Sequence, residues 1–234
     1  MARVIAAIVR HGDYHQRHQT PSAHQPFALT ERGTIQAQAA AQSIRVMLEQ
    51  TGWNLYNAMD CSRLQRAWQT AEIMRTELSD CFLQPANLLQ TDSLAERGLG
   101  SAANLSVAEI EAILAQDPRY SSPPADWKSN SHYCLPLMGA ESLMQAGERV
   151  AYHLRCRLQQ LAAEVIDDTL QVFVGHGAAF RHAAHLLGVL QFEQIAALSM
   201  HHGEPIYLEH HPGGDWTQVG GYWKVRSAET GYTD

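Results

Sequence analysis

Two apolar segments that each lead into a histidine and a glycine constrain the fold of this 234-residue chain most strongly. Residues 4–9 (VIAAIV) are followed by an arginine, His11 and a glycine, and residues 170–175 (LQVFVG) are followed by His176 and a second glycine. Both segments are almost continuously apolar, which is typical of strands covered on both faces of a parallel sheet. The sequence therefore predicts buried parallel strands that each present a histidine just beyond the carboxyl end.

Other segments alternate between strand and helix patterns. Short β-rich runs occupy residues 58–61, 205–209 and 222–225, and helical patterns occupy residues 29–50, 66–78, 139–161 and 178–190. Thr30 is expected to cap the first of these helices. This alternation predicts a single domain over residues 1–234 with an α/β fold, a three-layer α/β/α sandwich around a mostly parallel sheet.

A proline-rich stretch interrupts this pattern. Residues 115–139 contain four prolines and no helical or strand periodicity, and they are too numerous for a simple connection. Solvated disorder is one interpretation, but Trp127 and several tyrosines and leucines make the stretch more apolar than disorder favours. We expect an inserted lid over about residues 98–140.

Charge and cysteine content narrow the functional classes. The net charge of −7 argues against nucleic acid or an anionic membrane surface as the main partner. The four cysteines form no CxxC pair or metal-finger spacing, so we expect reduced thiols. No signal-peptide pattern or membrane-length apolar run is present, and we expect a cytoplasmic protein.

Chemically reactive side chains follow four predicted strand ends. Besides His11 and His176, the segment MDCSRLQRAWQTAE (59–72) offers Arg63 and Arg66, and DSLAERGLGS (92–101) offers Glu96. Ligands bind at the carboxyl ends of the strands in open α/β sheets, so these groups are expected to meet at one edge. Each alone is compatible with a structural role, but together they indicate an anion-binding active site.

The ordered motifs resemble the histidine phosphatase superfamily, branch 1, the phosphoglycerate mutase-like proteins. The resemblance rests on RHG (10–12), LTERGTIQAQAAA (29–41), SRLQRAWQTAE (62–72), LAERGLG (94–100), GAESLMQAGERV (139–150) and GHGAAFR (175–181). It implies a phosphomonoester hydrolase that forms a phosphohistidine on His11 and needs no metal or cofactor. The implied catalytic residues are His11, Glu96 and His176, and the implied phosphate-binding residues are Arg10, Arg66 (rather than Arg63) and His176.

The chemistry explains why such a site needs these groups. A neutral His11 can accept a phosphoryl group, and nearby positive charge favours the neutral form by lowering its pKa. Arginine forks can hold the equatorial phosphoryl oxygens as charge shifts in the transition state. Glu96 is expected to protonate the leaving alkoxide and then activate water. By the same resemblance, Arg17, Arg97 and Gly177 are candidates for substrate contact.

Several alternatives remain open at this point. A phosphoglycerate mutase-type transferase is the main one, but the predicted lid contains only two basic residues, Arg119 and Lys128, which favours a phosphatase. A phosphate-binding interaction module without catalysis belongs to a different class. The 13 histidines match no zinc-ligand spacing, and Cys61 is expected in the core. The expected partners are a phosphorylated small molecule or phosphoprotein, and the chain is a candidate homodimer.

Overall fold

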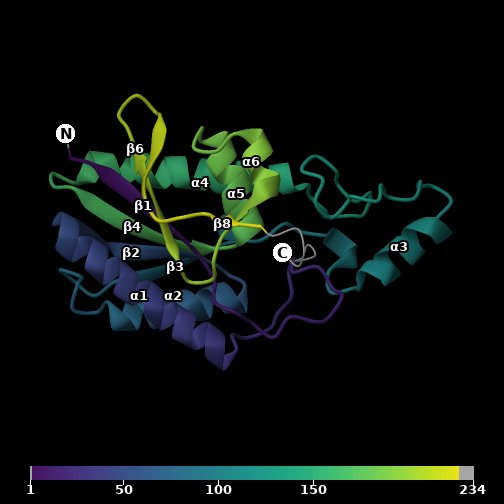
Figure 1. Ribbon diagram of the computed structural model, residues 1–234, viewed down its shortest axis with the longest axis horizontal. Helices are drawn as coiled ribbons and strands as arrows, with labels where there is room; N and C mark the ends of the chain where they lie inside the picture. Colours follow the sequence, from purple (N-terminus) through teal and green to yellow (C-terminus); the bar gives the residue numbers. More distant parts are fainter. Residues whose placement is uncertain (1, 227–234) are drawn as a thin grey trace.

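The computed structural model describes residues 2–226 and contains a six-stranded sheet in the order β3-β2-β4-β1-β6-β7 (Figure 1). Its strands are β1 (Val4–Arg10), β2 (Asn54–Ser62), β3 (Asn87–Thr91), β4 (Thr169–Gly175), β6 (Pro205–His210) and β7 (Trp216–Gly220). The first four strands named are parallel, whereas β6 runs antiparallel to β1 and to β7. The predicted mostly parallel sheet is confirmed.

Helices cover both faces of this sheet (Figure 1). On one face lie α1 (Glu31–Thr51) and α2 (Gln65–Glu77), and on the other lie α4 (Leu143–Glu164) and α5 (Gly177–Leu186), with α6 (Phe192–Ala197) packed on α5. This is the expected three-layer α/β/α sandwich.

Strand β1 shows why its sequence is apolar without interruption. Val4, Ala6 and Ile8 pack into the core beneath α4 and α5, whereas Ile5, Ala7 and Val9 pack into the core beneath α1 and α2. Successive side chains of a strand point to opposite faces, so a strand between two helical layers needs apolar residues at every position.

Polar caps and a left-handed glycine fix the ends of the long helices. Thr30 accepts a hydrogen bond from the backbone N–H of Gly33, as predicted, and Gly52 ends α1 with a φ of 72°. Ser142 and Gln145 form a reciprocal capping box that starts α4. Helix α4 therefore begins immediately after the lid segment, at a defined position.

The segment 98–140 leaves and rejoins the sandwich at one place. Leu99 and Ala140 form an isolated antiparallel bridge, and the N–H of Glu141 donates to the carbonyl oxygen of Gly98 across 3.0 Å. The segment extends to one side of the sandwich (Figure 1) and carries a short 3₁₀ turn, η2 (Gly100–Ala102), and helix α3 (Val107–Gln116). Its apolar cluster includes the fully buried Trp127. The segment 98–140 is thus ordered, and its role as a lid stays a prediction; α3 is a helix that the sequence patterns did not predict.

The remaining differences from prediction involve sheet edges. Strands β3 and β7 were not predicted, because their side chains are largely exposed and polar and show no apolar pattern. The predicted strand at 222–225 is reduced to β8 (Lys224–Val225), which pairs with β5 (Leu198–Ser199) in a separate two-stranded ribbon. Of the helices within residues 2–226, none combines the length and hydropathy that a bilayer crossing requires.

Candidate active site

Strand register brings the two histidine segments together. Arg10 of β1 is the register partner of Gly175 of β4, so the residues that follow both strands leave the sheet side by side. The N–H of His11 donates to the carbonyl oxygen of Gly175 at 3.0 Å. The His11 and His176 rings consequently lie with centroids 5.0 Å apart, although the two residues are 165 positions apart in the sequence.

Arg66 bridges the two imidazoles. Its Nε donates to Nε2 of His11 at 3.1 Å, and its Nη2 lies 3.2 Å from Nδ1 of His176. The guanidinium is fully buried and is held in place by donation to the carbonyl oxygens of Gln25 and Ala23, each at 2.8 Å. The sequence placed Arg66 rather than Arg63 in this group, and Arg63 instead forms an exposed ion pair with Asp92.

These hydrogen bonds define the protonation of both rings. A guanidinium can only donate, so Nε2 of His11 and Nδ1 of His176 are both acceptors. The other ring nitrogens carry the protons: Nδ1 of His11 donates to the carbonyl oxygen of Gly12 at 2.7 Å, and Nε2 of His176 donates to Oγ of Ser62 at 2.9 Å. His11 is thereby presented with its Nε2 lone pair toward Arg66 and His176.

Burial and neighbouring charge keep these rings neutral. Burial is the main cause that lowers the pKa of His11 well below its usual value, and Arg66, His176 and Arg10 lower it further. The pKa of His176 is lowered in the same way, by burial first and then by Arg66. Both imidazoles are therefore neutral at physiological pH, which is the state that a nucleophilic histidine requires.

Two glycines allow the backbone and Arg10 to pack this closely. A Cβ on Gly12 would lie 2.3 Å from the carbonyl oxygen of Gly33, so any side chain there would displace the start of α1. A Cβ on Gly177 would lie 3.1 Å from Cδ of Arg10. Gly177 thus makes room for Arg10, whose Nη1 donates to the carbonyl oxygen of Met200 at 3.0 Å.

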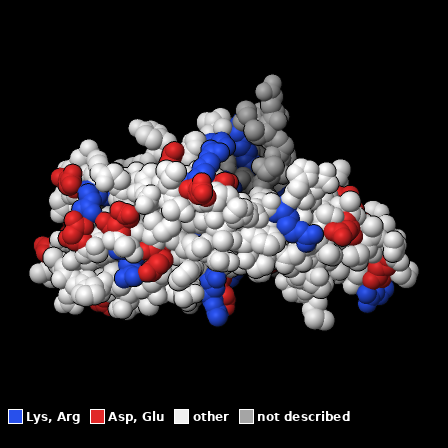
Figure 2. Space-filling model, turned by 90° about the horizontal axis from the view of Figure 1, so that it is seen from below, with Lys and Arg blue, Asp and Glu red and all other residues white. Residues whose placement is uncertain are grey.

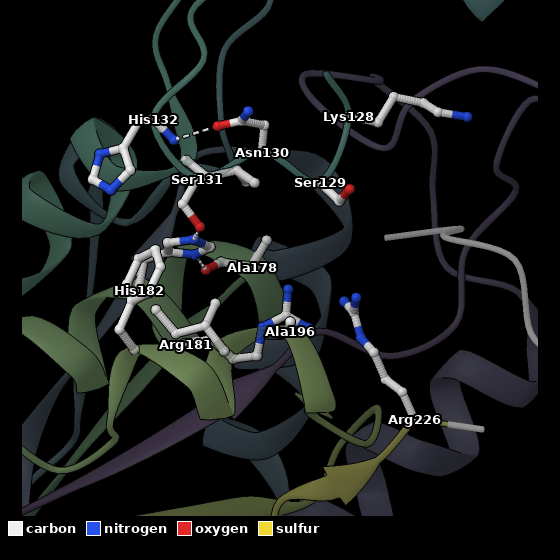
Figure 3. Close-up of a pocket in the computed structure, with 13 residues that line it drawn as sticks. Lys128, Ser129, Asn130, Ser131, His132, Ala178, Arg181, His182, Ala196 and Arg226 are labelled. Atoms are coloured by element: carbon white, nitrogen blue, oxygen red, sulfur yellow. Dashed lines mark hydrogen bonds between the residues drawn. The ribbon is translucent and has the colours of Figure 1, made fainter. Parts of the chain in front are cut away.

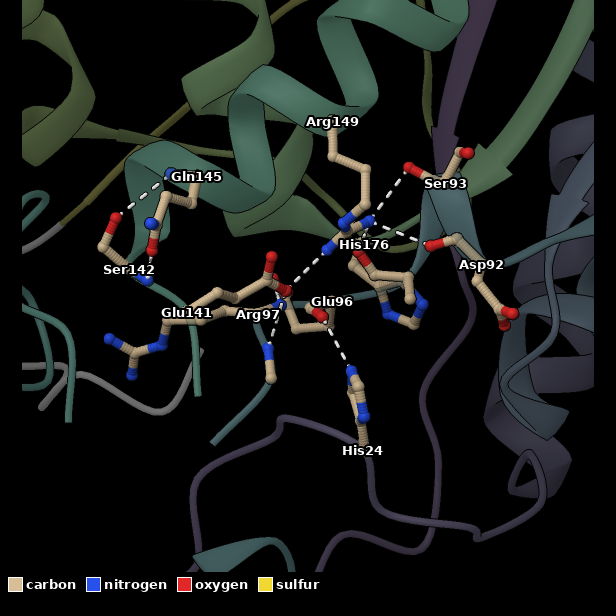
Figure 4. Close-up of polar contacts among 12 residues, drawn as sticks. His24, Asp92, Ser93, Glu96, Arg97, Glu141, Ser142, Gln145, Arg149 and His176 are labelled. Atoms are coloured by element: carbon tan, nitrogen blue, oxygen red, sulfur yellow. Dashed lines mark hydrogen bonds and ion pairs between the residues drawn. The ribbon is translucent and has the colours of Figure 1, made fainter. Parts of the chain in front are cut away.

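Glu96 lies in the turn that follows β3 and η1 (Asp92–Leu94), and its side chain is only 6% exposed (Figure 4). Its Oε1 accepts from the N–H of Arg97 at 2.9 Å, and its carbonyl oxygen lies 3.0 Å from Nε2 of His24. Burial lowers the pKa of Arg66, and Tyr14 and Glu96 oppose that shift. The carboxylate is therefore electrostatically coupled to the arginine that joins the two imidazoles.

An arginine on α4 holds the turn that carries Glu96 (Figure 4). Nη1 of Arg149 donates to three acceptors in this turn, the carbonyl oxygens of Asp92, Ser93 and Ala95. Its Nη2 forms a 2.6 Å ion pair with Glu141, which also accepts from the N–H of Gly98. Arg149 and Glu141 thus fix the backbone on both sides of Glu96.

Two predicted substrate-contact residues, Arg17 and Arg97, contact the segment 98–140. Arg97 is 7% exposed, its side chain extends toward the lid (Figure 4), and its guanidinium lies 5.9 Å from the ring centroid of Trp127. Arg17 donates through Nη1 to the carbonyl oxygen of Asn104 in the lid. The structure joins both arginines to the lid and does not bring Arg17 into the group around His11 and His176.

Sequence reasoning did not identify His202 as part of this site. Its Nδ1 lies 2.6 Å from the carbonyl oxygen of His11, and the two rings have centroids 5.4 Å apart. The next residue, Gly203, donates its N–H to the carbonyl oxygen of Arg10 at 2.9 Å. No local pattern marks His202, because its position at the site follows from the antiparallel pairing of β6 with β1.

Other reactive groups do not form a second centre in the part of the chain that the structure describes. No group of three or more His, Cys, Asp or Glu side chains within residues 2–226 is arranged to hold a metal ion. Burial raises the pKa of the Cys61 thiol to about 12, which fits the predicted core role better than a nucleophile. All four cysteines are free.

The sandwich and its paired histidines define the class of protein, and a family model agrees with them. The model of the histidine phosphatase superfamily (branch 1) matches residues 6–220. The chain belongs to this superfamily, as the sequence motifs predicted.

The individual relatives have low sequence identity to this chain. A 2,3-bisphosphoglycerate-dependent phosphoglycerate mutase from Parvibaculum lavamentivorans is 24% identical over 207 residues, which cover 88% of this chain and 90% of the mutase. The structure described as mycobacterial hydrolase 2 has a TM-score of 0.70 at 21% identity, with 98% of this chain and 94% of that chain covered. The mycobacterial glucosyl-3-phosphoglycerate phosphatase has a TM-score of 0.65 at 23% identity, with 96% and 99% covered. These structural likenesses establish the shared fold.

Proposed function

We propose that this protein is a metal-independent phosphomonoester hydrolase that acts through a phosphohistidine on His11. The observation that carries the proposal is the contact of Nε2 of His11 with Arg66, which in turn contacts His176. A neutral imidazole with its lone pair directed at a cationic, buried group is suited to attack a phosphoryl group held by that cation.

The proposed reaction has two displacements. The Nε2 lone pair of His11 attacks phosphorus, the bond from phosphorus to the ester oxygen breaks, and Glu96 transfers its proton to the leaving oxygen. Water then attacks the phosphohistidine and gives a proton to the Glu96 carboxylate, and the P–N bond breaks to release phosphate. Arg10, Arg66 and His176 hold the phosphoryl oxygens. The Nε–H of Arg66 transfers its hydrogen bond from His11 to one of these oxygens, and the Nε2–H of His176 transfers its hydrogen bond from Ser62 to another.

Turnover of p-nitrophenyl phosphate in excess chelator tests the proposal. We expect His11→Ala to abolish both turnover and the formation of a trapped phosphoenzyme. His211→Ala is the control, because His211 follows the end of β6 that lies away from His11, and it should retain both. The trapped phosphoenzyme should be acid-labile and alkali-stable, as a phosphoramidate is. Retained labelling in His11→Ala, or an alkali-labile adduct, would contradict the assignment.

A mutase-type phosphoryl transferase is the second candidate, because one relative is a phosphoglycerate mutase. A mutase must hold a second anionic group while excluding water, and the lid offers only Arg119 and Lys128. Arg119 is exposed and paired with Asp117. We therefore favour hydrolysis, and incubation with 3-phosphoglycerate distinguishes the two: faster formation of the 2-isomer than of free phosphate would establish the mutase.

An interaction module that binds phosphate without turnover is the alternative in which the protein is not an enzyme. It predicts phosphate binding by the wild-type protein with no release of phosphate from any phosphomonoester.

We propose phosphorylated small molecules or phosphoproteins as substrates. On the face seen in Figure 2, basic and acidic side chains are interspersed over the sandwich and the lid. Attraction of an anionic substrate would then depend on the local cations around His11.

A further inference from the structure

The buried ring of Tyr14 contacts both the candidate nucleophile and the arginine that joins the two imidazoles. Its centroid lies 5.3 Å from that of the His11 ring, at an interplanar angle of 86°. Cζ of Arg66 lies over the same ring, 4.5 Å from its centroid. The proposed reaction makes no use of Tyr14, although the ring contacts two of the groups on which that reaction depends.

Arg66 is a buried cation without a carboxylate partner. Within residues 2–226 its side chain donates hydrogen bonds only to the two imidazoles and to the carbonyl oxygens of Ala23 and Gln25, and it forms no ion pair with an aspartate or glutamate. Removing a guanidinium from water is costly, and burial accordingly lowers its pKa. The face of the Tyr14 ring supplies electrostatic attraction that a carboxylate would otherwise provide.

An aromatic ring suits this position better than a carboxylate does. An aspartate or glutamate would occupy N–H groups of Arg66 that the phosphoryl oxygens need, and its charge would repel a phosphate anion. Burial raises the pKa of Tyr14, so the ring is neutral at physiological pH. The ring therefore attracts the guanidinium and carries no charge that competes with phosphate.

A hydrogen bond holds the ring in place. The Tyr14 hydroxyl and Oγ of Ser22 lie 2.8 Å apart, and both residues are buried. Ser22 directly precedes Ala23, whose carbonyl oxygen accepts from Arg66 at 2.8 Å. Ala23 has a φ of 24°, in the left-handed region that residues with a Cβ rarely adopt. The ring and this carbonyl oxygen thus hold Arg66 from one tightly turned stretch of chain.

We propose that Tyr14 is a positioning residue, which holds Arg66 where its guanidinium binds the phosphoryl group. The proposal rests on the phosphomonoesterase function given above and adds a residue that acts through Arg66 rather than on the substrate. Without the ring, the guanidinium is free to leave its place between the imidazoles, and phosphate binding must then restore it.

Affinity for inorganic phosphate tests this role without requiring turnover. Tyr14→Leu keeps an apolar side chain and removes the ring, so it should weaken phosphate binding, measured by calorimetry, by roughly tenfold. Tyr14→Phe keeps the ring and loses the bond to Ser22, so its affinity should stay within roughly threefold of wild type. Tyr120→Leu is the matched control and should bind as wild type does, because Cζ of the exposed Arg119 lies 5.1 Å from the Tyr120 ring centroid, in the segment 98–140.

A double-mutant cycle shows whether Tyr14 acts through Arg66. In the Arg66→Gln background, Tyr14→Leu should have almost no further effect on phosphate affinity, because the charge that the ring holds is gone. The proposal would be overturned by equal losses in both backgrounds, by equal losses in Tyr14→Phe and Tyr14→Leu, or by unchanged affinity in Tyr14→Leu. The free energy of unfolding is measured alongside, because a purely structural role would lower it in Tyr14→Leu and leave the phosphate affinity of the folded protein unchanged.

Binding elsewhere on the molecule must be separated from binding at this site. A cavity of about 360 Å³ between residues 128–132, α5 and α6 is lined by neither Tyr14 nor Arg66 (Figure 3), so phosphate bound there would respond to neither substitution. Only binding that Arg66→Gln weakens is therefore compared, and its absence in the wild type would overturn the proposal. A wild-type protein that shows such binding but does not hydrolyse p-nitrophenyl phosphate would overturn the hydrolase function, while the affinities still decide the role of Tyr14.

Discussion

His202 donates a hydrogen bond from Nδ1 to the carbonyl oxygen of His11 across 2.6 Å, so a residue 191 positions away holds the backbone of the candidate nucleophile. Its neighbour Gly203 holds the carbonyl oxygen of Arg10, and Met200 accepts from the Arg10 side chain. The segment before β6 therefore fixes both residues that follow β1. This contact gives His202 a positioning role that can be tested separately from its ring chemistry.

Removing that contact should slow the chemical step. We expect His202→Ala to lower kcat for p-nitrophenyl phosphate by roughly 10- to 100-fold, because small displacements of a nucleophile reduce rates strongly. His202→Asn retains a donor amide and should recover part of the loss. His201→Asn is the control, because His201 is exposed and faces Glu204. Equal kcat in His202→Ala and wild type would show that the hydrogen bond is dispensable.

Arg66 should set the acidic limb of the pH–rate profile. Its charge lowers the pKa of His11, second only to burial, so Arg66→Gln should raise that pKa. Protonated His11 cannot attack, and the acidic limb of kcat/KM should therefore move to higher pH in this variant. Arg66→Lys keeps the charge but loses the planar fork, so kcat should fall by roughly 100-fold or more while the limb stays in place. An unmoved limb in Arg66→Gln would assign it to another group.

Glu96 should matter most for poor leaving groups. An alkyl phosphate releases a basic alkoxide, whereas p-nitrophenolate leaves without help, so Glu96→Gln should reduce turnover of alkyl phosphates by roughly 100-fold or more and of the aryl ester much less. Arg149→Gln should show the same selectivity in weaker form, because Arg149 holds the turn that carries Glu96. Arg155→Gln is the matched control on α4, since Arg155 donates to Leu186 instead. Equal losses on both ester types in Glu96→Gln would exclude Glu96 as the proton donor.

The free energy of unfolding should decrease as the pH is lowered, because His182 is buried in its neutral form. Burial lowers its folded-state pKa to about 4, whereas the unfolded chain titrates near the ordinary value. Below a pH of about 6.5 the unfolded state therefore binds a proton that the folded state does not, and His182 costs about 2 kcal/mol of unfolding free energy at pH 5. The free energy of unfolding, measured with urea, should fall between pH 7.5 and pH 5 in the wild type. In His182→Gln this fall should be smaller by about that amount. An identical pH dependence in variant and wild type would contradict this result.

The sequence predicted those parts of the fold and site that depend on local pattern. Strands β1 and β4 are recognisable because burial on both faces requires apolar residues throughout, and Thr30 is recognisable as a cap. The motif following β2 correctly favoured Arg66 over Arg63 for the group around His11. The catalytic roles of these residues remain predictions.

Contacts between distant segments were harder to predict. Strands β3 and β7 lie at sheet edges and carry polar residues, so no apolar pattern marks them. The bonds from His202 to His11 and from Arg149 to the turn before Glu96 depend on strand order and helix placement, which one sequence does not encode locally.

The bridge between Leu99 and Ala140 has a consequence for how such proteins diversify. Because both ends of the lid meet there, and because the lid has its own apolar cluster around Trp127, insertions, deletions or wholesale exchange between these two points need not shift any strand. These roughly forty residues can therefore change in sequence and length while the paired imidazoles stay where β1 and β4 put them.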